Sequence, residues 1–155
     1  GETVRKQHKY EEAARYYEES LPIFREIDNR MGVSIGLLNL GHVHTAMGED
    51  KTAWEYVCEA LEVSSAIGAV AIMLEGVVGA ALLQARTARY ERAAEWLGLV
   101  QAHPIFNQEI GQNAGPILAT LRRALPAGEL ETALARGAAL ELETVVAEIL
   151  GDTAK

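Results

Sequence analysis

The sequence predicts an all-α fold built from antiparallel helix pairs, and two observations lead to this class. Apolar side chains recur at three- and four-residue spacing through most of the chain, which is the pattern of a helix with one buried face. The composition is also rich in Ala, Leu and Glu and contains only 4 prolines, which favours helices. Together these observations favour an all-helical class.

An internal repeat of 40 residues organises these helices. Two columns of aligned residues show it most clearly: Ala13, Ala53 and Ala93 in one, and Tyr16, Tyr56 and Trp96 in the other. This pattern indicates stacked helix pairs, because an isolated pair leaves an apolar face that only the next pair can cover. We expect the small residues to permit close helix approach and the aromatic column to fill the space between neighbouring pairs.

The first repeat, residues 1–29, is predicted to be incomplete. Residues 2–7 represent the end of its first helix, and a second helix is expected from Tyr10 to Ile27. Pro22 lies inside this second helix, where it removes a backbone hydrogen bond and favours a kink. The chain also begins on Gly1 without a methionine, and we interpret it as a piece of a longer protein.

The second repeat, residues 30–68, is the complete one. Its two helices meet at the turn Gly48-Glu49-Asp50, and small residues such as Gly41 and Ala53 lie where the helices would approach closely. The third repeat, residues 69–103, is expected to contain helices at 70–88 and 90–102. The His103-Pro104 pair then ends the repeats, because a residue before proline avoids the helical region.

The remainder is predicted to cap the array. Residues 104–115 match no repeat and are expected to form a loop, and a helix is predicted from Pro116, a favourable first-turn residue. Pro126 ends that helix. The predicted cap, residues 116–150, continues with two short helices and is followed by a polar tail; these segments are 128–136, 141–150 and 151–155.

The helix pair at 37–61 resembles a tetratricopeptide (TPR) unit. The TPR signature is a Leu-Gly pair in the first helix, here Leu40-Gly41, and spaced small residues in the second. Residues 89–98 (RYERAAEWLG) and 121–150 resemble the end of TPR arrays in bacterial multidomain regulators. The resemblance implies a right-handed superhelix of helix pairs with a C-terminal helical cap.

In those regulators a signalling ATPase of the STAND class precedes the TPR array, and a DNA-binding domain can come before that. The resemblance therefore implies an intramolecular NTPase or DNA-binding domain as a possible partner of this chain. The phosphate-binding pattern G-x-x-x-x-G-K-[ST] does not occur in the sequence, so nucleotide hydrolysis is not assigned to it. The implied role is a protein-binding, signal-transducing module of a larger regulator.

The charge balance and the single cysteine limit the classes of binding partner and the cellular compartment that we expect for this chain. The net charge is -8, from 14 basic and 22 acidic residues, which opposes direct nucleic-acid binding because phosphate contacts require clustered Lys and Arg. No apolar run approaches the roughly 20 residues that span a bilayer. The single cysteine, Cys58, favours a reducing compartment, so we expect no membrane partner and a cytoplasmic location.

No catalytic, cofactor-binding or metal-binding residues are predicted, and the chain is not expected to be an enzyme. His42 and His44 lie two positions apart on a helix, so their side chains point in different directions and cannot share a metal ion. We expect His44 to pack between helices and His42 to face a partner. Cys58 has no predicted base beside it, which leaves it without an activated thiolate.

The predicted function is therefore protein or peptide binding through the concave groove that the first helix of each TPR pair lines. Asn39 occupies the column in which peptide-binding TPRs place an asparagine that binds ligand backbone. A groove of apolar and neutral polar groups favours an apolar peptide or helix. The predicted contact residues are Ile35, Leu38, Asn39, His42, Thr45, Glu75, Val78, Leu82 and Arg86.

Three alternatives remain open at this point. The superhelix could hold a small-molecule inducer of a transcriptional regulator, with Asn39, His42 and Arg86 as polar contacts. The chain could self-associate through apolar surface near Tyr17 and Leu21. The groove could also be covered by other domains of the parent protein.

Overall fold

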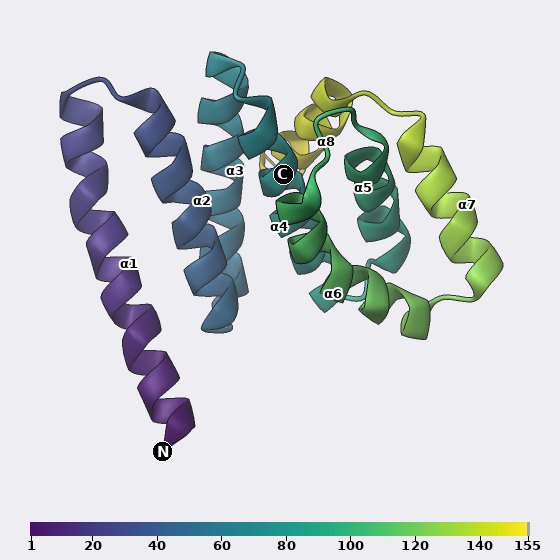
Figure 1. The fold of residues 1–155 in the computed structure, drawn as a ribbon, viewed down its shortest axis with the longest axis horizontal. Helices are drawn as coiled ribbons and strands as arrows, with labels where there is room; N and C mark the ends of the chain where they lie inside the picture. The colour runs from purple at the N-terminus through teal and green to yellow at the C-terminus, as the bar shows by residue number, and fades with distance from the viewer. Residues whose placement is uncertain (155) are drawn as a thin grey trace. The chain divides into compact units, whose positions relative to one another are not determined.

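The computed structural model describes residues 1–154, and every element in this range is a helix (Figure 1). The predicted all-α class is therefore confirmed. The chain forms two compact units, Gly1–Ile72 and Met73–Lys155, and each is described by itself. None of the helices in residues 1–154 combines the length and apolar character needed to cross a membrane. The helices are α1 Glu2–Glu26, α2 Arg30–Ala46, α3 Asp50–Ile67, α4 Val70–Arg86, α5 Tyr90–Ala102, α6 Gln108–Ala124, α7 Ala127–Ala138 and α8 Leu142–Ala154.

In the unit Gly1–Ile72, helices α1, α2 and α3 lie side by side (Figure 1). Close approach of α2 and α3 depends on Gly41, because a Cβ atom there would lie 2.8 Å from Cγ2 of Val57. Ala53 of α3 is fully buried and its carbonyl oxygen faces the same glycine, as the repeat pattern predicts. The core of this unit consists of Ala14, Leu21, Val33, Leu37, Leu38, Leu40 and Ala60.

Helix α1 differs from the sequence-based prediction, because it runs without a break from Glu2 to Glu26. We expected the helix to be interrupted between Gln7 and Tyr10. The intervening His8 and Lys9 are compatible with a helix, and residues 1–9 are all exposed. Because this segment is exposed, no packing within residues 1–154 turns the chain back, and the helix continues. Pro22 also lies within the helix.

The turns between successive helices share one geometry. Asp28, Gly48, Gly68 and Ala88 all adopt positive φ, at 54°, 79°, 69° and 63°, and they follow one another at 20-residue intervals. After each, a backbone N–H donates to a carbonyl five residues earlier, for example Asn29 N to Phe24 O at 2.8 Å. This is the Schellman motif, which satisfies carbonyls at a helix end. The 40-residue sequence period therefore corresponds to two equivalent turns.

Ala88 carries a backbone strain that glycine would relieve. Its φ of 63° brings Cβ close to a carbonyl oxygen, which costs about 1–2 kcal/mol for an L-residue. We expect Ala88→Gly to raise the free energy of unfolding by about 0.5–1 kcal/mol. Ala135→Gly is the control, because Ala135 is exposed in the interior of α7 and should lose about 0.5–1 kcal/mol. Urea unfolding measures both, and equal losses would contradict the strain at residue 88.

In the unit Met73–Lys155, helix α5 contacts both α6 and α7. It is buried along most of its length, and Trp96, Leu97 and Val100 are fully inaccessible. Two ion pairs tie it to neighbouring helices: Arg136 of α7 donates to Glu95 at 2.6 Å, and Arg92 lies 3.6 Å from Glu148 of α8. The apolar side chains of α5 are covered by neighbouring helices, and its charged Arg92 and Glu95 are paired with residues of α8 and α7.

Helices α5 and α7 cross at two glycines. A Cβ atom on Gly98 would overlap the carbonyl of Leu134, and one on Gly137 would overlap the carbonyl of Glu95. The backbones therefore touch directly, which only glycine permits. The last helix, α8, buries Leu142, Val145, Val146 and Ile149.

The position of helix α6 differs from two sequence-based predictions, one for the segment 104–115 and one for Pro116. The segment 104–115 was predicted as a loop, but α6 begins at Gln108, capped by Asn107, whose side-chain oxygen accepts from the Ile110 N–H at 2.9 Å. Pro116 was expected in the first helical turn and instead lies inside the helix. The N-cap and the burial of Ile110 and Ala114 on one helix face compensate for the hydrogen bond that proline removes.

The predicted tail also differs from the structure. We expected residues 151–155 to follow the last helix, whereas α8 extends to Ala154. Gly151 weakens a helix without ending it, and no proline follows Leu150. Lys155 lies outside the described residues.

The aromatic column is buried to different extents along the chain. Tyr16 is 66% exposed, Tyr56 is partly buried and Trp96 is fully buried. The expectation that all three fill spaces between helix pairs is therefore wrong for Tyr16. Tyr16 lies on a side of α1 that no described helix covers, since exposed Ile23 and Ile27 continue the same side.

Candidate functional site

The predicted contact residues fall into two groups, one on each unit. The first group lies on α2, where side chains three or four positions apart share one side of the helix. Ile35 is 44% exposed, Asn39 is partly buried and His42 is exposed. These three residues form an accessible line of one apolar and two neutral polar side chains.

Two neighbours extend this line, and the sequence analysis did not include them. Met31, four residues before Ile35, is 46% exposed, and Ala46, four residues after His42, is also exposed. The same helical spacing applied in both directions would have found them. We call the surface formed by Met31, Ile35, Asn39, His42 and Ala46 the α2 face.

Leu38 and Thr45, also predicted as contact residues, do not contribute to the α2 face. Leu38 is 4% exposed and belongs to the core of its unit. Thr45 is 9% exposed, and its hydroxyl donates to the carbonyl of Gly41 at 2.7 Å. Both were assigned to the partner surface from helical position alone, which does not distinguish the edge of an exposed stripe from the core beside it.

His42 lies in a partly desolvated environment. Its side chain is exposed, and yet the crowding around it removes enough water to lower the pKa of the imidazole below the ordinary value of 6.5. Desolvation disfavours the charged form of a histidine. The ring is therefore neutral at pH 7, when it can donate one hydrogen bond and accept another.

The second predicted group lies on α4, in the unit Met73–Lys155. Val78 is 3% exposed, which corrects its assignment to the partner surface. Glu75 and Leu82 are partly buried, and Arg86 is exposed. Helix α4 contains buried residues on all sides, so it offers less continuous surface than α2.

Glu75 is the titratable residue of this second group that its surroundings perturb. Burial raises the pKa of the Glu75 carboxyl, and the negative charge of Glu109 at the start of α6 raises it further. Both effects favour the protonated acid.

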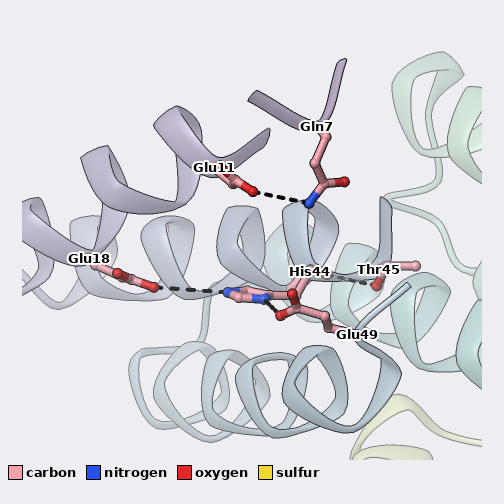
Figure 2. A network of polar contacts seen from close by, with 7 residues as sticks. Gln7, Glu11, Glu18, His44, Thr45 and Glu49 are labelled. Carbon is pink, nitrogen blue, oxygen red and sulfur yellow. Dashed lines mark hydrogen bonds and ion pairs between the residues drawn. The ribbon is translucent and has the colours of Figure 1, made fainter. Parts of the chain in front are cut away.

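His44 is confirmed as a packing residue. It is 8% exposed, and its ring stacks on Tyr56 of α3 at 5.3 Å between ring centroids. Nδ1 lies 2.8 Å from a carboxylate oxygen of Glu49, and Nε2 lies 4.0 Å from Glu18 of α1 (Figure 2). The carboxylate of Glu49 can only accept, so Nδ1 donates the hydrogen bond. His44 thus connects α1, α2 and α3.

The cysteine and the acidic residues in the described part of the chain do not form a metal-binding cluster. Cys58 is buried at 3% exposure within α3. No group of three or more His, Cys, Asp or Glu side chains among residues 1–154 is arranged to hold a metal ion. The α2 face therefore remains the principal candidate site.

Comparison with known proteins gives one match, which covers the first part of the chain. A family model described as tetratricopeptide repeat matches residues 1–66. This match supports a tetratricopeptide-repeat array in that part of the chain, which contains α1, α2 and nearly all of α3. Tetratricopeptide repeats generally mediate protein–protein interaction and form a non-enzymatic scaffold. The searches of curated proteins and of solved structures gave no significant match.

Proposed function

We propose that this chain is a non-enzymatic interaction module that binds the apolar side of a helix or peptide through the α2 face. The observation that carries the proposal is the continuity of that face. Met31 and Ile35 are each exposed by more than 40%, and Asn39 and His42 continue the same line. None of its five residues carries a charge at pH 7.

The chemistry of the α2 face suits a ligand that is apolar at one end. Met31 and Ile35 offer hydrophobic contact, and methionine adapts its shape to different partners. The Asn39 amide can both donate to and accept from a peptide backbone. Helix α2 has 17 residues and is therefore about 25 Å long, enough to contact a short peptide along its length.

Selection from a library of displayed random peptides tests this proposal. We expect the protein to enrich peptides with apolar residues at helical spacing, and Ile35→Glu to weaken binding of a selected peptide at least about tenfold. Ile105→Glu is the matched control, because Ile105 is 46% exposed but lies outside the α2 face. Failure to enrich peptides, or equal effects of the two variants, would refute the proposal.

The pH dependence of peptide binding follows from the lowered pKa of His42. Above the ordinary pKa the neutral ring can be covered by a ligand at little cost, whereas at lower pH a bound ligand must cover a charged ring. We therefore expect weaker peptide binding at about pH 5 than at about pH 7.5. Fluorescence titration at both values measures this. The dependence should disappear in His42→Gln, and its persistence would assign it to another group.

A second candidate function is recognition of a small molecule, favoured by the partly desolvated His42 next to Asn39. A thermal-shift screen with metabolites distinguishes the two functions, because ligand at 100 times its Kd adds about 2.7 kcal/mol of stability. Self-association is the other competing use of the α2 face. Light scattering would detect a dimer, and Ile35→Glu would return it to a monomer if this face forms the interface.

We also infer that the module belongs to a larger signalling regulator, of the kind that carries a STAND-class ATPase before its TPR array. The order of elements after α6 supports this inference. A helix that ends near Arg136-Gly137 is followed by the Leu-Glu-rich start of α8. The encoded sequence that precedes Gly1 tests it, since a STAND-class ATPase domain should be found there.

A further inference from the structure

The unit Gly1–Ile72 contains a cavity that the α2 face does not include. It lies where the end of α1, the start of α2 and the end of α3 meet, and its volume is about 310 Å³. Its apolar floor is formed by Phe24, Val33, Val63 and Ala66. This size is at the lower end of the range for small-molecule sites, about 300–1,000 Å³, and suits a molecule as large as one amino acid.

The apolar floor is held in place by the core of the unit. Phe24 and Val63 pack against the core but keep exposed surface, and Val33 is 6% exposed. The Phe24 ring lies directly against Gly32, because a Cβ atom there would approach it to 2.9 Å. A floor fixed in this way loses little conformational freedom when a ligand covers it.

Charges of both signs surround this floor. Arg25 and Arg30 contribute guanidinium groups, and Asp28 and Glu62 contribute carboxylates. Arg25 is also paired with Glu59 of α3 at 3.0 Å, whereas Arg30 and Asp28 are 4.0 Å apart. All of these groups are close enough to the apolar floor to meet a ligand that rests on it.

The two arginines and two carboxylates around the cavity determine which charges a bound ligand can carry. A purely anionic ligand would meet Asp28 and Glu62 as well as the arginines, and a purely cationic one would meet Arg25 and Arg30. A ligand with both charges can pair its carboxylate with a guanidinium and its ammonium with a carboxylate. We propose that the cavity binds a free amino acid with an apolar side chain, in its zwitterionic form.

Three probes that share a phenyl group on a short chain test the proposal: L-phenylalanine, 3-phenylpropanoate and 2-phenylethylamine. The last two each lack one of the two charges. Titration of the protein, followed by backbone amide NMR, should give a Kd on the order of 1 mM or below for L-phenylalanine. We expect each single-charge probe to bind at least about tenfold more weakly. Equal binding of either of them, or no binding of L-phenylalanine, would overturn the proposal.

Two kinds of variant locate the binding. Ala66→Phe should fill the cavity and abolish binding, whereas Ala135→Phe, at an exposed alanine of α7 outside the cavity and outside the α2 face, should leave binding unchanged. Arg30→Gln and Asp28→Asn should each weaken the binding of L-phenylalanine at least about tenfold. Asparagine is suitable at residue 28 because it tolerates the positive φ of that position. Unchanged binding in Ala66→Phe would place the ligand elsewhere. Peptide binding to the α2 face should persist in Ala66→Phe, so the two proposals fail independently.

Discussion

Gly137→Ala is expected to lower the free energy of unfolding of the unit Met73–Lys155 by about 3 kcal/mol or more. The new methyl group would overlap the carbonyl of Glu95 on α5. A backbone carbonyl cannot rotate away as a side chain can, so the two helices must separate along their contact. The ion pair between Arg136 and Glu95 lies at the same crossing and would be disturbed with it.

Calorimetry measures this effect as a fall in the melting temperature of that unit of roughly 12–24 °C. Gly98→Ala should act similarly, because its Cβ atom would overlap the carbonyl of Leu134. Gly128→Ala is the matched control in α7, since a Cβ atom there has no neighbour within 4 Å. That variant should be neutral or more stable by up to about 1 kcal/mol. Similar melting temperatures for Gly137→Ala and Gly128→Ala would refute the direct backbone contact.

Alanine substitutions along the aromatic column should have effects that increase along the chain. Trp96 is fully buried in α5, and Trp96→Ala should cost about 3–5 kcal/mol because it removes a large side chain from a packed interior. Tyr56 is partly buried against His44, and Tyr56→Ala should cost about 1–2 kcal/mol. Tyr16 is 66% exposed, so Tyr16→Ala should change stability by about 0.5 kcal/mol or less.

Urea unfolding of the three variants under the same conditions tests this series. Trp54→Ala serves as a control for the loss of a tryptophan, because Trp54 is only partly buried in α3 and should cost less than Trp96→Ala. Equal losses at residues 16, 56 and 96 would mean that the repeat column, rather than the surroundings of each residue, determines the energetic contribution.

The repeat pattern predicted the parts of the fold that depend on local spacing. The 40-residue columns indicated helix pairs, and the structure places equivalent turns at Asp28, Gly48, Gly68 and Ala88. Gly48 and Gly68 can be recognised in the sequence as turn residues, because glycine adopts positive φ at little cost. Asp28 and Ala88 adopt the same geometry without a glycine, and the sequence placed Ala88 inside a helix predicted at 70–88, whereas α4 ends at Arg86.

The structure differs from the sequence-based predictions at positions where the local preference of a residue conflicts with helix packing. Pro116 is favourable in a first helical turn, but α6 starts earlier because Asn107 caps it and Ile110 is buried. His8 aligns with Gly48 and Ala88, yet α1 passes through it without a turn. In both cases the sequence contains residues compatible with two conformations, and the surrounding contacts select one.

For the candidate site, too, some features could be predicted from the sequence and others depend on the packing of the helices. The helical class and the line of side chains through Ile35, Asn39 and His42 follow from the 3.6-residue period of a helix, and the repeat length follows from the aligned columns. The burial of Leu38 and Thr45 and the accessibility of Met31 became known from the tertiary structure. It also shows that a cavity with charges of both signs forms beside Phe24. Burial depends on which helices pack together, and one helical period is compatible with several such packings.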